Sequence, residues 1–555
     1  MLVSITVGGV QQFIAESRTT ADLRNGSAMY SALAGQIAGG LAALKGDVVF
    51  PAIRPSTEGM PNRIVAVIQG NDVAATVDAV VTEARLWWQH QAVRLLDAPA
   101  AVLPPPISWV AAPEVEYSDA WATLGRLAVA RKRTRTFVGY NEPTGALCSL
   151  SGRFPAGTER DHLRRRERLS DVCWMKRLWE RGGFPSTRAI LAGAYQYALT
   201  GRLDGDRELA SHALDLADSV DLVGTVHSRT SGVRPRLDSV AQTASGLGAR
   251  IARLDGSWFD PLQWTEQAVF DEHGAVPDAS TLGLGRDSAA MLSRRAVELG
   301  LVGLPTHLAI VAHDVDEMGR RLSEGPADAL RQFHGQVSSA LVASAETQRR
   351  AVEDAACGRL VYSGGDDALA FVPAAEALTV AENLRSCVLD SLAVLMPRVT
   401  VSSAIVFFPA DYPLQRAVRR AQTAVQDSKH AGRDRLTIVH LNGGGERAAG
   451  VARWVTGDRL ATRQLADLAS ARVNGRAVAA DLLADRNDLA ASSLVLDGEV
   501  ERRVGRRSEV GKGRAGPLAA ELVGLCDDGP SGGSRAHRVI EWCQVIGELE
   551  ELSCL

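Results

Sequence analysis

The first 140 residues alternate between two hydrophobic periods, one typical of strands and one typical of helices. Two long stretches, 10–44 and 72–96, have the amphipathic spacing of helices. Four short apolar runs have the length of strands: 2–7, 47–51, 63–68 and 107–112. The order is therefore strand, helix, strand, strand, helix, strand. This order predicts a ferredoxin-like domain.

The same order returns further along the chain, from residue 308. Strand-like runs recur at 308–313, 359–362, 368–373, 401–408 and 435–441. Helical stretches separate them, one running through Ala355 and two more beginning at Ala374 and Pro413. We therefore expect two copies of one supersecondary plan.

The remaining segments have mainly helical periods. Region 141–300 predicts helices joined by loops, and helical spacing returns at 456–489 and 515–525. Segments rich in charge or in Gly, Ser and Pro are expected to be loops, at 498–517 and 527–534. The sequence predicts an α+β protein with two ferredoxin-like, palm-type domains and helical domains between and after them. The expected boundaries are 1–140, 141–300, 301–445 and 446–555.

Composition limits where the protein works and what it binds. With 61 basic and 65 acidic residues the net charge is -4, so any binding to nucleic acid or acidic membrane must be local. No apolar run approaches the ~18 residues that a membrane span needs. The opening residues lack the pattern of an export signal, so we expect a cytoplasmic protein without membrane contacts. Seven cysteines, an odd number, argue against a disulfide framework.

The second copy differs from the first in its acidic residues. Its first strand ends at Asp314, and its central hairpin turns through Ser363-Gly364-Gly365-Asp366-Asp367, whereas the matching hairpin of the first copy has no paired acids. In a ferredoxin-like fold this strand and this hairpin lie side by side, so the three aspartates are expected to converge. We therefore interpret the first copy as non-catalytic and the second as catalytic.

Converging carboxylates predict a divalent metal site. Mg²⁺ prefers carboxylate ligands together with substrate phosphates, and a pair of Mg²⁺ or Mn²⁺ ions suits transfer of a nucleotidyl group from a triphosphate. The glycines permit a sharp turn and close approach of a phosphate or base. Glycine and aspartate are also ordinary turn formers, so the hairpin alone fits a plain β-turn equally well. The matching acid at Asp314 favours the metal site.

Eight segments carry further motifs in a shared order: 8–27 (GGVQQFIAESRTTADLRNGS), 48–51 (VVFP), 61–63 (PNR), 184–192 (FPSTRAILA), 313–319 (HDVDEMG), 358–373 (GRLVYSGGDDALAFVP), 412–417 (YPLQRA) and 428–436 (SKHAGRDRL). In this order they resemble the large polymerase-like subunit of type III CRISPR effector complexes, most closely the Cmr type. The resemblance covers most of the first 445 residues. Any one motif is weak, and their shared order is strong.

The resemblance implies a cyclic oligoadenylate synthase that joins ATP in a palm-type site when its complex binds foreign RNA, as antiviral defence. Carried over to this chain, Asp314, Asp366 and Asp367 hold the metals. Asp316 assists them, or is instead an acid that stabilises the start of a helix.

The resemblance also implies residues that bind the nucleotide. These are Ser363, Gly364 and Gly365 of the hairpin, with Lys429 and Arg433 further along the chain. Lys429 would neutralise the triphosphate. The alternative for Lys429 is a solvated lysine at the end of a helix.

Two features depart from the family pattern. The family often begins with an HD nuclease domain, and this chain starts directly at the first palm-like copy, so we expect no DNA cutting by this subunit. The family also tends to carry a zinc ribbon of two CxxC pairs. Here one cysteine of each pair is replaced, leaving Cys148 with Ser151 and Cys173 with Ser170. Zinc prefers four thiolate or imidazole ligands, so we expect none, even with His162 between them.

The resemblance implies guide RNA, target RNA and other effector subunits as partners. Two basic segments, 131–135 and 164–168, are candidate RNA contacts, although solvated helix faces are the favoured explanation of both. Three other functions stay open. They are a scaffold without turnover, a diguanylate cyclase, whose hairpin expects a glutamate and an aromatic here, and an enzyme that couples ATP to another small molecule such as S-adenosylmethionine.

Overall fold

The structure is a computed structural model of the 555-residue chain. It describes residues 1–552 except for 52–58, 71, 98–101, 115, 135–144, 158–166, 181–183, 225–234, 244–245, 302, 354–356, 365, 491–492, 509–511 and 527–533. Among these described residues, no helix is long and apolar enough to cross a membrane.

The first copy of the predicted plan is a four-stranded antiparallel sheet with helices. Its elements are β1 (Leu2–Val7), α1 (Val10–Ala15), α2 (Thr20–Ala43), β2 (Asp47–Phe50), β3 (Arg63–Val67), α3 (Val73–Leu96), β4 (Ile107–Ala112) and α4 (Tyr117–Arg133). The strand order β2-β3-β1-β4 is that of a ferredoxin-like fold, so this prediction is confirmed.

The helical stretch expected over 10–44 is two helices, α1 and α2. The break follows from a capping box at the start of α2: the backbone N–H of Asp22 donates to Thr19 Oγ1 at 3.0 Å, and the backbone N–H of Thr19 donates to Asp22 Oδ2 at 3.3 Å. The short α1 is therefore a helix separate from α2.

The second copy contains the same plan with an extension. Its elements are β5 (His307–Val315), α12 (Met318–Ser323), α13 (Leu330–Glu353), β6 (Arg359–Ser363), β7 (Asp367–Pro373), α14 (Ala377–Leu392), β8 (Val401–Pro409), α15 (Leu414–His430), β9 (Arg435–Asn442) and β10 (Gly445–Arg453). The sheet order is β10-β9-β8-β5-β7-β6. Strand β9 pairs in parallel with β8, and β10, which the sequence did not predict, continues the sheet past residue 445.

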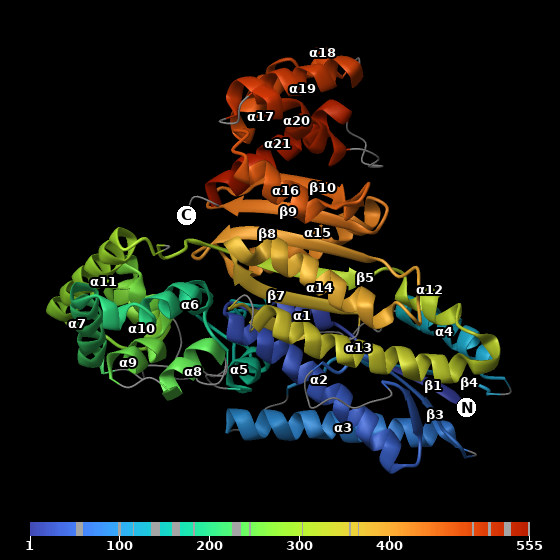
Figure 1. Cartoon of the computed structure of the whole chain (residues 1–555). Helices are drawn as coiled ribbons and strands as arrows, with labels where there is room; N and C mark the ends of the chain where they lie inside the picture. The colour runs from blue at the N-terminus through green and yellow to red at the C-terminus, as the bar shows by residue number, and fades with distance from the viewer. Residues whose placement is uncertain are drawn as a thin grey trace.

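The region between the two copies is helical, as expected. It contains α5 (Asp171–Leu178), α6 (Thr187–Thr200), α7 (Arg207–Val223), α8 (Pro235–Thr243), α9 (Leu247–Arg253), α10 (Glu266–His273) and α11 (Ala279–Glu298). Figure 1 shows α6 to α11 as a separate group of helices at one side of the molecule, with their own buried core.

The C-terminal region is a helical bundle packed on β10. It contains α16 (Ala461–Ser470), α17 (Gly475–Ala484), α18 (Arg486–Leu489), α19 (Ser493–Arg507), α20 (Ala515–Gly524) and α21 (Arg535–Leu552).

The loop expected over 498–517 is wrong, because much of it is helix α19. Its charges form ion pairs along the helix surface, such as Arg502 with Glu499, while Val500 and Val504 are buried in the core. The other expected loop, 527–534, lies outside the described residues except for Ser534.

The two sheets face each other across helices that belong to both copies. In Figure 1 the second sheet lies above α13, and helices α2 and α3 of the first copy lie below α13. Helix α13 contacts β2 and α4 of the first copy, and α2 contacts β6 of the second. One hydrophobic core joins residues of both copies, including Val65 and Trp121 with Val337 and Leu341. The two domains therefore hold any site between them in a fixed arrangement.

Candidate functional site

Three acidic side chains gather where β5 meets the β6–β7 hairpin. Asp314 lies directly opposite Asp367, the first residue of β7, in the antiparallel register. Residues opposite each other in such a pair project to the same face of the sheet. The backbone N–H of Val315 donates to the carbonyl of Asp366 at 2.8 Å, which continues the pairing into the turn. The register therefore brings Asp314, Asp366 and Asp367 to one end of the sheet.

Burial and mutual repulsion shift the ionisation of this cluster. Burial, followed by the charge of Asp314, raises the pKa of Asp366 to about 6. Burial, followed by the charges of Asp366 and Asp314, raises the pKa of Asp367 well above its ordinary value. Burial also raises the pKa of Asp314, although Lys429 opposes that shift. A bound cation would offset the repulsion between these neighbouring carboxylates and favour their ionised form.

Lys429 is paired with this cluster. It lies at the end of α15, and its Nζ donates to Oδ1 of Asp314. The preceding residue fixes the end of the helix, since Ser428 Oγ donates to the carbonyl of Ser403 at 2.8 Å. The structure thus places Lys429 beside the acids, in contact with a carboxylate and only partly exposed.

Asp316 does not join the acidic cluster. Its side chain is fully buried, and both oxygens accept hydrogen bonds: Oδ1 from Ser402 Oγ at 2.7 Å, and Oδ2 from Thr400 Oγ1 at 2.9 Å and from the backbone N–H of Asp434 at 3.0 Å. These bonds fix the turn that follows β5. The geometry supports a structural role for Asp316, where the sequence left open either assistance to the metals or stabilisation of a helix start.

Arg433 lies near the same end of the sheet, but it does not line the cavity beside the acids. It follows α15 with a positive φ of 63°, and its half-exposed side chain has Nε 3.9 Å from Oε1 of Glu317. In this structure the Arg433 side chain is therefore not positioned to contact a nucleotide in that cavity.

The hairpin is packed tightly against a loop of the first domain. Gly59 has a φ of 77°, and a Cβ on it would lie 2.8 Å from the carbonyl oxygen of Ser363. Only glycine fits there without moving the hairpin. Ser363 is buried, with its Oγ 3.4 Å from Oε1 of Gln348. Gly364 donates its N–H to the carbonyl of Asp367 at 3.1 Å, and Gly365 lies outside the described residues.

A cavity of about 690 Å³ lies between the two ferredoxin-like domains, with the acids in its wall. The second domain contributes Asp314, Tyr362, Gly364, Asp366 and Asp367. The first domain contributes backbone and side chains from several segments that include Gly8, Gly9, Ser27, Tyr30, Asn62, Arg63, Trp121 and Lys132. The volume is within the range of small-molecule sites, which occur preferentially between domains.

Several residues of this wall were not recognised from the sequence as site residues. Tyr362 lies next to the acids, which, after burial, raise its pKa well above the ordinary value. Arg63 is held in the wall by Ser4 Oγ, 3.1 Å from its Nε, and lies over the Trp121 ring. Segments 8–27 and 61–63 were noted as motifs, and their placement here explains why glycines and a partly buried arginine occur in them.

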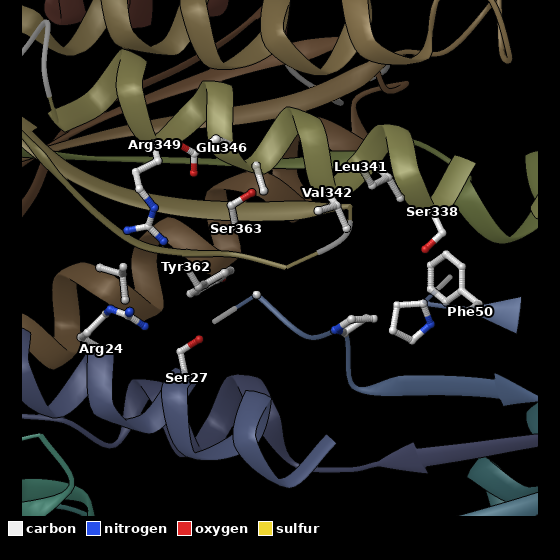
Figure 2. Close-up of a pocket in the computed structure, with 15 residues that line it drawn as sticks. Arg24, Ser27, Phe50, Ser338, Leu341, Val342, Glu346, Arg349, Tyr362 and Ser363 are labelled. Atoms are coloured by element: carbon white, nitrogen blue, oxygen red, sulfur yellow. The ribbon is translucent and has the colours of Figure 1, made fainter. Parts of the chain in front are cut away.

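A smaller hollow of about 170 Å³ adjoins the cavity. Figure 2 shows Arg24 of α2 and Arg349 of α13 pointing into it from opposite sides, with Tyr362 between them. Ser27 and Tyr362 line both spaces. The region beside the hairpin is thus lined by aspartates on one side and, on the other, by Arg24 and Arg349 together with Glu346.

The donor set fits a hard divalent cation, since aspartate oxygens are the ligands that Mg²⁺ and Mn²⁺ take. Within the described part of the chain, no three His, Cys, Asp or Glu side chains already surround a common point as metal ligands do. Asp314 is bonded to Lys429 instead. A metal that takes Oδ1 of Asp314 would have to displace the Lys429 ammonium.

The predicted zinc-ribbon remnant retains its two cysteines side by side. A short antiparallel bridge joins Leu147 to Pro155, and Cys148 and Cys173 are both buried. The two thiols share a hydrogen bond, which lowers the pKa of Cys148 and raises that of Cys173. His162 lies outside the described residues. The absence of zinc stays a prediction.

Two models of known protein families match the chain, one in each ferredoxin-like domain. The model described as Cas10/Cmr2, second palm domain, matches residues 307–437, and the model described as CRISPR-associated protein Cmr2, N-terminal, matches residues 2–93. These two segments of the chain are therefore similar to two domains of the Cas10/Cmr2 family. The acidic hairpin lies inside the second palm domain. No curated protein matches the chain.

Solved structures agree with this assignment at the level of the fold. A type III-B Cmr-beta bound to cognate target RNA matches with a TM-score of 0.68 at 13% identity, over 99% of this chain and 83% of that chain. The apo state of type III-B Cmr-beta matches with a TM-score of 0.64 at 12% identity, over 99% of this chain and 81% of that chain. The similarity extends over both palm domains and the helical regions.

Proposed function

We propose that this chain is a metal-dependent nucleotidyltransferase that converts ATP into a cyclic oligoadenylate messenger in antiviral defence. The observation that carries the proposal is the placement of Asp314, Asp366 and Asp367 in the wall of a cavity between the two palm-type domains. The match of residues 307–437 to a palm domain supports nucleotidyl transfer over other uses of paired carboxylates.

In this proposal Asp314, Asp366 and Asp367 hold Mg²⁺ or Mn²⁺. Bound there, the metal would favour ionisation of a ribose hydroxyl and offset the charge of the departing pyrophosphate. The residues of the chain bind and orient ATP. Gly364 leaves room for a phosphate beside the hairpin, and the ammonium of Lys429 exchanges the Asp314 carboxylate for a triphosphate oxygen, a charge-assisted bond.

The reaction balances as an ordinary phosphodiester synthesis. The ribose hydroxyl of one nucleotide attacks the α-phosphorus of the next, one P–O bond forms, and the bond to pyrophosphate breaks. To close the ring, the terminal ribose hydroxyl of the oligoadenylate attacks the α-phosphorus at the other end of the same oligoadenylate, and the last pyrophosphate leaves. The 690 Å³ cavity between the domains is where both reacting nucleotides would be held.

The proposed partners are guide RNA, target RNA and other effector subunits. Their support is the family match and the similarity in fold to a Cmr-beta structure bound to cognate target RNA. The basic residues 131–133 at the end of α4 are described, whereas Arg135 and Arg164 to Arg166 lie outside the described residues. The expected cytoplasmic location is part of the same proposal.

One observation favours the alternative of a scaffold without turnover. Lys429 is bonded to Asp314 where the proposal requires a metal ligand. A permanent ion pair would keep the cluster neutral enough to fold and prevent metal binding. The two functions therefore differ in whether Lys429 leaves Asp314 when a magnesium nucleotide is offered.

Binding of ATP to the purified chain tests this difference. We expect Mg²⁺-dependent binding of a non-hydrolysable ATP analogue by calorimetry, lost in the double variant Asp366→Ala, Asp367→Ala. Asp458→Ala, in the exposed turn between β11 (Val455–Thr456) and β12 (Arg459–Leu460), is the matched control. Binding that is equally strong with EDTA, or unchanged in the double variant, contradicts the proposed site. GTP in place of ATP tests the cyclase alternative.

A further inference from the structure

A second hollow lies at the outer edge of the first sheet and shares no lining residue with the cavity beside the acids. It has a volume of about 390 Å³ and is lined by Asp78, Val81, Thr82 and Arg85 of α3, Ile107, Ser108 and Trp109 of β4, and Arg131 of α4. We call it the β4 groove. Strand β4 is the edge strand of its sheet, so one side of its backbone is not paired to another strand.

The β4 groove is positively charged. Arg85 and Arg131 are exposed, and among the described residues neither forms an ion pair with an acid. Arg131 donates to Thr134 Oγ1 at 3.0 Å. Among the described lining residues, Asp78 is the one acid, and it accepts a hydrogen bond from Trp109 Nε1 at 3.0 Å, which holds the indole ring in place. The next two residues of α4, Lys132 and Arg133, are also exposed cations.

This combination selects a particular ligand chemistry. Two guanidinium groups without acidic partners among the described residues suit phosphates, and an aromatic ring in the same wall suits a base. An open, edge-on groove suits an extended single strand better than a rigid duplex. Since the whole chain carries a net charge of -4, such binding depends on this local charge.

We propose that the β4 groove binds single-stranded RNA, with phosphates on Arg85 and Arg131 and a base against Trp109. The site adds a specific RNA contact to the proposed function and does not depend on ATP chemistry. Its failure would leave the nucleotidyltransferase assignment untouched, because binding of RNA is measured without nucleotide or metal.

The last turn of α4 joins this groove to the nucleotide cavity. Arg131 lines the β4 groove, and the adjacent Lys132 lines the cavity between the domains. An RNA strand held by Arg131 therefore fixes the same helical turn that carries Lys132.

Fluorescence anisotropy with a labelled single-stranded 12-mer RNA of mixed sequence tests the proposal on the purified full chain. We expect the double variant Arg85→Ala, Arg131→Ala to weaken binding at least fivefold and to reduce the slope of log K against log salt by about 1.4, the value for two phosphates on a single strand. Trp109→Ala also weakens binding, and Trp109→Phe restores part of it. Arg207→Ala, which removes an exposed arginine from α7, leaves binding unchanged.

A gain of function separates binding from structural damage. Asp78→Asn keeps an acceptor for Trp109 Nε1 and removes the one negative charge of the groove, so RNA should bind two- to threefold more tightly. The proposal is overturned if the double variant binds RNA with unchanged affinity and salt slope, or if Asp78→Asn weakens binding. It is equally overturned if the groove variants keep RNA binding and instead lose a companion protein subunit, which makes the groove a protein interface.

Discussion

Lys429 Nζ donates to Asp314 Oδ1 across 115 residues of sequence, at the end of the second sheet where Asp366 and Asp367 also lie. The pair neutralises one carboxylate of a cluster that burial and repulsion keep reluctant to ionise. The same contact makes Lys429 a competitor of any metal that binds Oδ1 of Asp314.

Removal of this competitor should strengthen metal binding. Lys429→Met leaves Asp314 without its cation, so the affinity of the nucleotide-free chain for Mn²⁺ should rise about tenfold, as expected for a charge-assisted hydrogen bond of ~1.5 kcal/mol. Affinity for the ATP analogue should fall, because the ammonium that would meet the triphosphate is gone. Calorimetry measures both.

Lys45→Met is the control, since Lys45 is an exposed lysine of the first domain. Unchanged Mn²⁺ affinity in Lys429→Met would show that the Asp314 carboxylate is not a metal ligand. Raised affinity for both metal and nucleotide would show that Lys429 has no role with the triphosphate.

The acidic cluster should cost stability in a pH-dependent way. Burial, then Asp314, raises the pKa of Asp366 from 3.8 to about 6, so the folded chain holds this proton more tightly than the unfolded chain does. Stability therefore falls as pH rises from about 4 through 6. Asp366→Asn cannot ionise and should be more stable by on the order of 1–3 kcal/mol at pH 8 in EDTA.

Thermal unfolding at pH 4.5 and pH 8 measures this difference. The advantage of Asp366→Asn should be small at pH 4.5 and full at pH 8. Added Mg²⁺ should stabilise the parent chain more than the variant, which narrows the gap. A gap of the same size at both pH values contradicts the account of the cluster.

The sequence predicted the two ferredoxin-like domains well because their strands and helices have clear local periods. It missed β10, whose residues GERAAGVAR are polar on the exposed side of an edge strand and resemble a loop in composition. It also assigned much of α19 to a loop, because the charges of an exposed helix face were interpreted as solvated coil. Both errors concern segments with little apolar signal.

The candidate site was predictable only in part. The acids on one strand and one hairpin follow from a known strand order, so Asp314, Asp366 and Asp367 could be brought together in advance. The buried role of Asp316 could not, because its partners Thr400 and Ser402 are brought to it by another strand. Tyr362, Ser27 and Arg63 meet in one cavity through contacts between domains, which no local pattern encodes.

The contact between the domains at the hairpin should matter for nucleotide binding. Gly59→Ala places a Cβ 2.8 Å from the carbonyl of Ser363 and forces the hairpin to move. We expect ATP-analogue affinity to fall at least fivefold. Gly274→Ala, with a similar φ of 72° and nothing within 4 Å, should be strained to a similar degree without this effect. Equal affinities in the two variants would refute the packing argument.

Cys148 and Cys173 provide a test of the prediction that the zinc-ribbon remnant binds no zinc. Purified parent chain should contain no stoichiometric zinc by elemental analysis, because Ser151 and Ser170 replace two thiolates. Ser151→Cys with Ser170→Cys should restore a four-thiolate set and bind about one zinc per chain. One zinc per parent chain would overturn the expectation, and no zinc in the double variant would show that the knuckle has lost the required geometry.

Mass spectrometry of the reaction products tests most directly whether Asp366 and Asp367 serve oligoadenylate synthesis. The assembled complex is given ATP with Mg²⁺ or Mn²⁺, and matching target RNA is then added. The account predicts pyrophosphate and cyclic oligoadenylate from the parent chain and from Asp458→Ala, and neither from Asp366→Ala with Asp367→Ala. Undiminished product from that double variant, or no product from the parent complex with target RNA bound, would contradict it.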